Sequence, residues 1–293
     1  MPDYQLTCSS TVDLSLAQLA EYSIAYLPFH FQLNETQYVD DFGQSMTYSE
    51  FYTAIKHGAM PTTSQNNPAA YCEFFIPFLK AGKDILHIAF SSGLSGDYQS
   101  ACMAKELLKE QFPDRSIEII DSLAASSGYG LLLLEVAKQK QQGASLNETV
   151  VFALKTRLHI QHWFFSTDLS HYKRGGRISA TTAAIGGALH ICPIMMMDAK
   201  GMLTPHHKVR GKKKAIRALC EQFQIHVQDL DNIPHCFISH SDCLDDALAL
   251  KTQLTSTFPE LRDHITIFSI GTVIGSHTGP GTVALFFKGD VRH

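Results

Sequence analysis

The sequence predicts a two-domain α/β protein, in which an N-terminal parallel sheet with flanking helices precedes a C-terminal mixed α/β domain. Its 293 residues are about twice the length of a typical domain of roughly 150 residues. Hydrophobic residues make up 45% and charged residues 18%, a composition that excludes a disordered chain or a coiled coil. Strand-like and helix-like segments alternate along the first half, which is typical of a parallel sheet covered by helices.

Apolar runs and capping signals predict the elements of the first half. Strands are expected at residues 4–8, 24–31, 84–90 and 116–121. Helices are expected at residues 10–21, 47–56, 68–81, 97–112, 126–142 and 145–158. Their start signals are capping residues and a proline: Ser10 with Asp13, the capping boxes Thr47–Glu50 and Ser145–Glu148, and Pro68.

The pattern changes after about residue 158, where we place the boundary between a domain of residues 1–158 and one of residues 159–293. Strands are expected at residues 160–166, 190–197, 202–209, 235–239 and 265–270, with a hairpin turn at 198–201. Helices are expected at residues 211–223 and 245–257. The closing run, residues 282–287, is expected to pair with this second sheet.

Charge and cysteine usage narrow the classes of function. The formal net charge is −4 and the sequence pI is about 6.4, so nucleic acid is not an expected partner and membrane contact is at most transient. The longest apolar stretch, residues 180–197, is interrupted by Gly186, Gly187, His190 and Pro193, and the N-terminus lacks the features of a signal peptide. The seven cysteines are scattered without a C-x-x-C pair, which favours a reducing, cytoplasmic location.

Two hydroxyl-rich segments are candidate anion-binding sites. Residues 90–96 (FSSGLSG) lie between an expected strand and an expected helix, where small residues and free helix N–H groups permit close approach of an anion. Residues 61–65 (PTTSQ) are an extended stretch before the next helix. An ordinary helix cap explains the first segment equally well when it is taken alone. A solvated loop is the favoured explanation of the second segment when it stands alone.

Two basic segments and one histidine complete the candidates. Residues 172–179 place Gly175 and Gly176 between basic residues, and residues 208–214 contain five basic residues in seven. A surface turn and a solvated helix face are the alternatives for these two segments. His277 lies in the glycine-rich stretch 271–281, which we expect to be a ligand-binding loop, because histidine can donate a hydrogen bond to a carboxylate. The less favoured alternative is a structural loop in which the histidine caps a helix. The other histidines lack a coherent set of metal ligands, so no metal site is expected.

Taken together, these segments resemble the DegV family over nearly the whole chain. The matching pieces, in chain order, are residues 10–14 (STVDL), 38–41, 63–65 (TSQ), 91–101 (SSGLSGDYQSA), 121–122, 175–178 (GGRI), 193–194, Arg210 with 213–215 (KKA), 240–242 (HSD) and 274–281 (IGSHTGPG). The resemblance implies a two-domain DegV-like α/β fold that buries a long-chain fatty acid, with the carboxylate near the domain interface. In some members the protein serves as the fatty-acid-binding subunit of a kinase and presents the carboxylate to a separate ATP-binding subunit.

The resemblance also implies roles for individual residues. The carboxylate contacts carried over by motif are Thr63, Ser91 or Ser92 with Gly93, and His277, with Arg210 nearby. Arg177, Lys212 and Lys213 are expected to contact a partner or a phosphate. The chain departs from the family pattern where Ser9 replaces the usual acid, and where Asn66 and Asn67 separate the TSQ motif from Pro68.

Three functions are consistent with these residues. The first is a fatty-acid-binding protein with no cofactor and no chemistry of its own, acting beside an ATP-binding kinase subunit. The second is a serine-dependent lipid hydrolase or acyltransferase that uses Ser91 or Ser92 with His277, with Asp121 or Asp242 as the orienting acid. The third is a regulatory protein whose surface changes with lipid occupancy.

Overall fold

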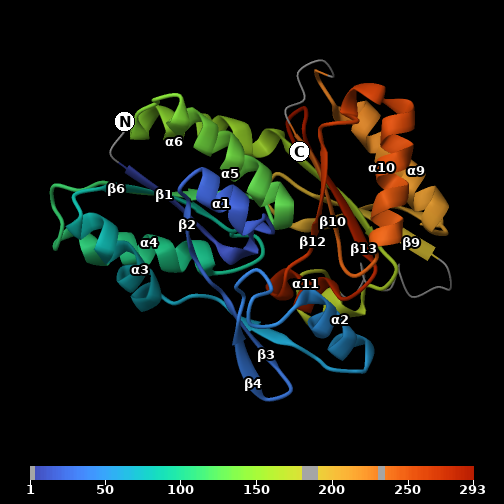
Figure 1. The fold of residues 1–293 in the computed structure, drawn as a ribbon, viewed down its shortest axis with the longest axis horizontal. Helices are drawn as coiled ribbons and strands as arrows, with labels where there is room; N and C mark the ends of the chain where they lie inside the picture. Colours follow the sequence, from blue (N-terminus) through green and yellow to red (C-terminus); the bar gives the residue numbers. More distant parts are fainter. Residues whose placement is uncertain (1–3, 180–190, 230–234) are drawn as a thin grey trace.

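The computed structural model describes residues 4–179, 191–229 and 235–293. Figure 1 shows two larger sheets side by side, with a small sheet below them. The described strands are β1 (Tyr4–Ser9), β2 (Ala25–Leu27), β3 (His30–Leu33), β4 (Thr36–Val39), β5 (Thr62–Ser64), β6 (Asp84–Ala89), β7 (Ile117–Asp121), β8 (Ile160–Ser166), β9 (Ile191–Met197), β10 (Leu203–Arg210), β11 (Cys236–His240), β12 (Ile265–Ser269) and β13 (Thr282–Lys288). The described α-helices are α1 (Leu16–Glu21), α2 (Tyr48–Lys56), α3 (Pro68–Lys80), α4 (Asp97–Lys109), α5 (Ser126–Gln141), α6 (Leu146–Thr156), α7 (Ser170–Arg174), α9 (Lys212–His226), α10 (Leu244–Thr257) and α11 (Thr272–Thr278).

The first sheet is parallel and comes from the N-terminal half. Its strand order is β2-β1-β6-β7. Apolar residues of α3 and α4 cover one face, and α5 packs on the other. Three helices of the N-terminal half begin where their sequence signals predict: the capping boxes of Thr47 at α2 and Ser145 at α6 both form, and Pro68 is the first residue of α3.

The second sheet is mixed and comes from the C-terminal half. Its order is β10-β9-β8-β13-β11-β12, antiparallel except for the parallel pair β11–β12. Side chains alternate along β8: Trp163 and Phe165 pack in the cluster under α9 and α10, whereas Phe164 faces the opposite cluster with α5. A parallel sheet followed by a mixed sheet confirms the predicted fold class. The expected strand at 190–197 is β9; its first expected residue, His190, lies outside the described residues.

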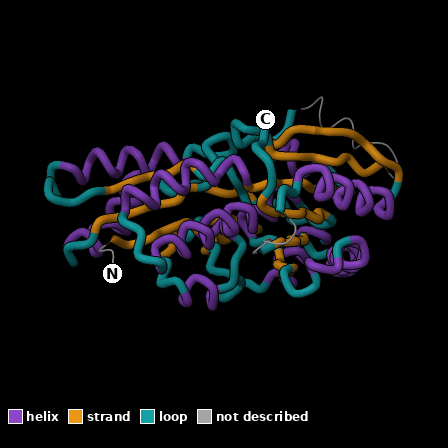
Figure 2. The backbone as a smooth tube through the Cα atoms, turned by 90° about the horizontal axis from the view of Figure 1, so that it is seen from above, coloured by secondary structure: helices purple, strands orange, loops and turns teal. Residues whose placement is uncertain are grey.

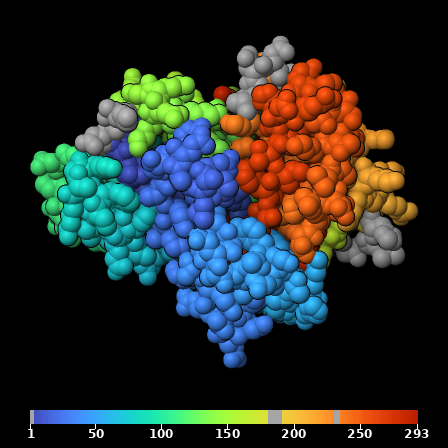
Figure 3. Space-filling model, viewed as in Figure 1, coloured from blue at the N-terminus to red at the C-terminus, as the bar shows by residue number. Residues whose placement is uncertain are grey.

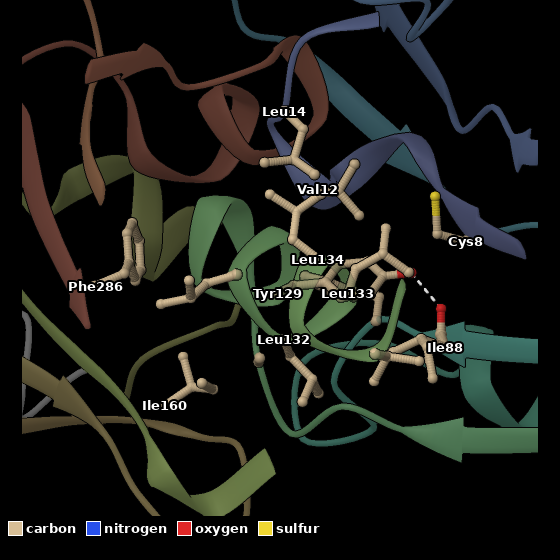
Figure 4. Close-up of a cluster of buried hydrophobic side chains, with 14 of the residues drawn as sticks. Cys8, Val12, Leu14, Ile88, Tyr129, Leu132, Leu133, Leu134, Ile160 and Phe286 are labelled. Atoms are coloured by element: carbon tan, nitrogen blue, oxygen red, sulfur yellow. Dashed lines mark hydrogen bonds between the residues drawn. The ribbon is translucent and has the colours of Figure 1, made fainter. Parts of the chain in front are cut away.

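Helix α5 lies between the two larger sheets. Every residue from Ser126 to Ala137 is buried, so the helix is covered on all sides. Figure 4 shows Leu133 and Leu134 of α5 beside Val12 and Leu14, and Leu132 toward Ile160. The Tyr129 hydroxyl donates to the Ile88 carbonyl of the parallel sheet. The view from above in Figure 2 shows the helices and strands arranged in these layers.

The structure corrects three of the sequence-based expectations. The helix expected from Ser10 is a short 3-10 turn, then Asp13 with φ 46°, and then α1, which is capped by Ser15. The strand expected at 24–31 is divided around Pro28, which has no N–H for a ladder, into β2 and β3 of different sheets. The expected loop at 271–281 contains helix α11, so His277 lies in a helical turn.

The segment between β2 and α3 forms a small unit in which the helix was predicted and the sheet was not. Strands β4, β3 and β5 make an antiparallel sheet, and α2 packs on it through Phe31, Phe51, Tyr52 and Ile55. In Figure 3 this unit protrudes from the lower edge of the molecule. Because β5 carries Thr63 and α2 holds the start of α11, the unit positions two sides of the candidate site described below.

Gly130→Ala is expected to destabilise the protein by about 1–3 kcal/mol through overpacking, despite the higher helix propensity of alanine. A methyl group there would lie 2.7 Å from the Val12 carbonyl oxygen and 2.6 Å from Leu14 Cδ2. Urea unfolding measures the change. Gln139→Ala, at the half-exposed end of α5, is the matched control. A Gly130→Ala protein as stable as this control would contradict the close packing of α5.

Candidate functional site

A cavity of about 400 Å³ lies between the two larger sheets at the N-terminal end of α5. Ligand pockets in proteins typically have volumes of about 300–1,000 Å³. Both halves of the chain line it: Phe29, Thr63, Ser64, Gln65, Phe90, Leu94, Ser95, Ala125 and Ser126 from the first, and His162, Phe164, Tyr172, Arg177, Met197, Leu203, Ile270, Val273, Ile274, His277, Thr278, Thr282, Ala284 and Phe286 from the second.

Most of the cavity wall is apolar. Phe29 and Phe90, whose rings meet edge to face, belong to the N-terminal half. Phe164 and Phe286 project from neighbouring strands of the mixed sheet. Such a wall provides no partners for the polar groups of a ligand, so it suits a hydrocarbon.

A hydrogen bond between two predicted site residues marks a polar part of the wall. Thr63 Oγ1 lies 2.8 Å from His277 Nε2, although the two residues are 214 positions apart in the chain. Thr63 is in the middle of β5, and His277 is in the last turn of α11. Both side chains line the cavity. If Nε2 carries the ring proton, the threonine hydroxyl hydrogen is available to a ligand.

The surroundings of His277 keep its ring neutral. Burial, together with the nearby charge of Arg177, lowers the pKa of His277 to about 4. Its Nδ1 is buried and has no hydrogen-bond partner among the described residues. A Cβ on Gly175 would lie 2.2 Å from that Nδ1, so the first glycine of the pair 175–176 allows α7 to end against the ring.

Arg177 adds a positive charge to the cavity wall. Its Nε donates to the Leu94 carbonyl at 3.1 Å and its Nη1 to the Gly175 carbonyl, which leaves guanidinium donors for a ligand. Burial lowers the pKa of Arg177, but an arginine remains protonated at neutral pH. The sequence predicted Arg177 as a partner or phosphate contact, whereas the structure places it on the cavity wall beside His277.

The predicted residues Ser91, Ser92 and Gly93 are not among the described residues that line the cavity. The buried Ser91 hydroxyl donates to the Gly201 carbonyl at 2.8 Å. A Cβ on Gly93 would lie 2.7 Å from the same carbonyl oxygen. Ser92 is exposed, and its N–H donates to Asp121 Oδ1. This segment therefore holds the turn between β9 and β10, and a role for it in carboxylate binding stays a prediction.

The basic segment also lies away from the cavity lining. Arg210 is exposed at the end of β10, and Lys212 and Lys213 are exposed at the start of α9. Lys212 Nζ forms an ion pair with Asp246 at 2.6 Å. The structure therefore does not bring Arg210 together with Thr63 and His277.

A Ser–His–acid arrangement is not formed by the residues considered for a hydrolase. The Ser91 hydroxyl donates a hydrogen bond to the Gly201 carbonyl. Nε2 of His277 is hydrogen-bonded to Thr63 Oγ1. Asp121 accepts backbone N–H groups, and Asp242 pairs with Lys56. Within the described part of the chain, no carboxylate accepts a hydrogen bond from Nδ1 of His277.

Across residues 4–179, 191–229 and 235–293, no group of three or more His, Cys, Asp or Glu side chains is placed to hold a metal ion. Nor is any helix in these ranges long and apolar enough to cross a membrane.

Sequence reasoning missed Ser95 and Ser126 as cavity residues. Ser95 belongs to the hydroxyl-rich segment 90–96, and its position just before α4 is the signal that could have distinguished it from Ser91. Ser126 begins α5, but no local motif separates it from an ordinary helix start.

A glycine of the stretch 271–281 allows close packing of α11. A Cβ on Gly275 would lie 2.5 Å from Tyr52 Oη, whose hydroxyl donates to the Ile270 carbonyl.

Comparison with known sequences identifies relatives of full length. A family model described as "Uncharacterised protein, DegV family" matches residues 5–290. The chain is 38% identical over 292 residues to a DegV domain-containing protein of Clostridium perfringens, covering 100% of this chain and 99% of that protein. It is 36% identical over 284 residues to one of Lactococcus lactis, covering 97% and 96%.

Solved structures share the fold over their whole length. A DegV family protein of Thermus thermophilus, described as binding fatty acid, superposes with a TM-score of 0.86 at 27% identity, covering 98% of this chain and 100% of that one. A fatty-acid-binding DegV family protein of Streptococcus agalactiae gives a TM-score of 0.86 at 25% identity, covering 99% and 100%. With the family model and the relatives matched almost from end to end, the chain belongs to the DegV family.

Proposed function

We propose that the protein binds one long-chain fatty acid without chemistry of its own, the carboxylate lying at Thr63, His277 and Arg177 and the chain along the apolar wall. The observation that carries the proposal is a cavity of about 400 Å³ that is apolar over most of its wall and offers clustered donors and one cation at Thr63, His277 and Arg177. The relatives from Thermus thermophilus and Streptococcus agalactiae are described as binding fatty acids, which supports the same ligand class here.

Two magnitudes favour a hydrocarbon ligand. Unfilled, an apolar cavity of about 400 Å³ would cost on the order of 10 kcal/mol at about 24 cal/mol per Å³, as much as the whole stability of many proteins. A chain of about 14 methylenes, at about 0.8 kcal/mol each, gains on the order of 11 kcal/mol on burial. Association costs of about 4–15 kcal/mol oppose this gain, so the tail supplies affinity and the polar head sets the orientation.

Thr63→Ala is expected to weaken fatty-acid binding by about 1.5–3 kcal/mol, because it removes one hydrogen bond to a charged carboxylate. This corresponds to a roughly ten- to hundredfold rise in Kd. Calorimetric titration of the delipidated protein with a saturated fatty acid measures it.

Thr62→Ala is the matched control for this variant. Thr62 precedes Thr63 on β5, is exposed, and makes no side-chain hydrogen bond within the described residues. Equal affinities for the two variants, or a lower melting temperature for Thr63→Ala with unchanged affinity, would contradict the assignment of Thr63 to the head group.

Ligand binding is expected to raise the pKa of His277 from its value of about 4 in the ligand-free protein. A carboxylate beside the ring favours the imidazolium, so the titration midpoint moves up. NMR titration of the ring resonances, with and without fatty acid, measures both midpoints. His87, whose burial in the N-terminal core lowers its pKa to about 3, is the internal control and should not move. An unchanged midpoint for His277 would remove it from the head-group site.

We further propose that a separate ATP-binding subunit phosphorylates the bound carboxylate. In this step a carboxylate oxygen attacks the γ-phosphate of ATP on the partner, and ADP leaves. The exposed basic start of α9 supports a docking role, since on an acidic chain such a patch attracts an acidic surface. We place the protein in the cytoplasm, where its seven free thiols would remain reduced.

Charge reversal of Lys213 and Lys214 is expected to slow acyl-phosphate formation at low salt and to leave fatty-acid affinity unchanged. These two lysines are chosen because Lys212 is already paired with Asp246. The rate is measured with labelled ATP and a candidate ATP-binding partner across a salt series. Reversal of the exposed lysines Lys80 and Lys109, at the ends of α3 and α4, is the control. Equal rates for the two double variants at low salt would contradict docking at α9.

A further inference from the structure

A second polar group faces the cavity at the start of α5. Ser126 lines the cavity and has φ 54°, and its hydrogen-bond partner Asp13 has φ 46°. Left-handed backbone is uncommon for residues other than glycine and costs free energy, so the surrounding structure must hold both residues in place. Two such residues, bonded to each other at a cavity wall, indicate a functional constraint.

The Asp13 carboxyl is buried with a second carboxyl close by. Asp13 Oδ1 accepts the Gly271 N–H at 3.0 Å, and Oδ2 is bonded to the Ser126 hydroxyl. A Cβ on Gly271 would lie 2.6 Å from Asp13 Oδ1 and 3.6 Å from Asp40 Oδ1, so the two carboxyls flank the same residue. Each aspartate is 3% exposed, and neither forms an ion pair with any described residue.

Burial disfavours the charged form of both carboxyl groups and raises the pKa of each. Asp40 keeps the negative charge more readily, since the hydroxyls of Ser10 and Thr272, each at 2.6 Å, and the Thr272 N–H donate to it. Burial, and to a lesser extent Asp40, raises the pKa of Asp13 to about 8 against the opposing hydrogen bonds. The other ionisable groups that face Asp13 are Tyr48 and Tyr52 of α2, whose pKa values burial raises, so they stay neutral.

The position of the proton on Asp13 follows from its partners. In the protonated acid Oδ1 remains an acceptor for the Gly271 N–H, so the proton lies on Oδ2 and is donated to Ser126 Oγ, the reverse of the bond that the ionised carboxylate accepts from Ser126. The Ser126 hydroxyl then cannot donate to Asp13. Its hydrogen is free to turn toward the cavity that Ser126 lines.

We propose that Ser126, backed by a protonated Asp13, is a second ligand contact that recognises an oxygen atom, hydroxyl or oxo, partway along the acyl chain. The inference rests on the proposed fatty-acid function. Asp13 contacts Gly271 at the start of α11, and His277 lies six residues further, about 9 Å along the helix. The second contact is therefore separated from the carboxylate site by several carbons of the chain.

The free-energy cost of an unpaired buried hydroxyl explains why an oxygenated chain should bind more tightly than a plain hydrocarbon chain. A plain hydrocarbon leaves the Ser126 O–H facing an apolar wall without an acceptor, whereas an oxygenated chain supplies one. The buried oxygen of the ligand is satisfied by the same bond. Selectivity is expected only for the positions along the chain that reach Ser126.

The test uses delipidated protein and a series of oxo-octadecanoic acids that differ in the position of the keto group, whose oxygen can only accept a hydrogen bond, with octadecanoic acid as the reference. The measured quantity is the ratio of the two Kd values, in which head-group effects cancel. At a pH of about 7, one unit below the pKa of Asp13, the best isomer should be favoured about three- to tenfold in the wild-type protein. The preference should fall toward one at a pH of about 9, where Asp13 ionises and takes back the Ser126 hydrogen.

Three variants separate this contact from general stability. Ser126→Ala should lose the preference at both pH values. Asp13→Asn should keep the preference at both pH values. Its amide oxygen accepts the Gly271 N–H, and its amide nitrogen donates to Ser126 and does not titrate. Ser127→Ala is the matched control: Ser127 is buried, bonds to the Asp13 carbonyl and Ser239, is not among the described cavity residues, and should leave the ratio unchanged.

The outcomes distinguish this inference from the proposed function. If no isomer is preferred by the wild-type protein, or Ser126→Ala keeps the preference, the inference is wrong while octadecanoic acid binding still stands. If octadecanoic acid itself does not bind, the fatty-acid function fails. Should Asp13→Asn not fold, the wild-type pH series and Ser126→Ala decide the question alone.

Discussion

The burial of α5 between the two larger sheets is the constraint on which the rest of the structure depends. Because every residue from Ser126 to Ala137 is buried, the helix fills the space between the sheets and keeps them apart along its length. Beyond its N-terminal end the sheets remain separated, and the cavity occupies that space, with Ala125 and Ser126 at the junction. The same packing that stabilises the core thus creates the site. It also explains why both halves of the chain line the cavity.

Long-range contacts place polar groups at the edges of this space. The small sheet and α2, inserted between β2 and α3, bring Thr63 to one side, and α11 brings His277 to it. The start of α11 is held by Asp13 and Asp40 from the N-terminal half and by Tyr52 of α2. Burial then sets the charges: it lowers the pKa of His277 and raises that of Asp13, so both are neutral near pH 7 while Arg177 keeps its charge. Among the described residues that line the cavity, Arg177 is therefore the charged group beside the neutral side chains of Thr63 and His277.

The sequence predicted the elements with local signals and missed those that depend on distant contacts. Both capping boxes and Pro68 start helices as expected, because their signals act within one helical turn. Thr63, His277 and Arg177, selected partly through the family resemblance, line the cavity. Ser91 and Gly93 share the same motif but contact Gly201, a residue about 110 positions away, which no local pattern encodes. Helix α11 was missed because it is stabilised by long-range contacts of its glycines, Gly275 with Tyr52 and Gly271 with Asp13. The division of the strand at Pro28 was missed because β2 and β3 pair with strands of two different sheets.

A crystal structure of the protein with a bound long-chain fatty acid tests the central claim most directly, because it locates both ends of the ligand. The account predicts the carboxylate within hydrogen-bond distance of Thr63 Oγ1, beside the ring of His277 and near the guanidinium of Arg177. The chain should run between the sheets past Ser126 and Phe286 at the N-terminal end of α5. A carboxylate bound at Ser91 and Ser92, outside the cavity, or a chain lying on the protein surface would contradict it.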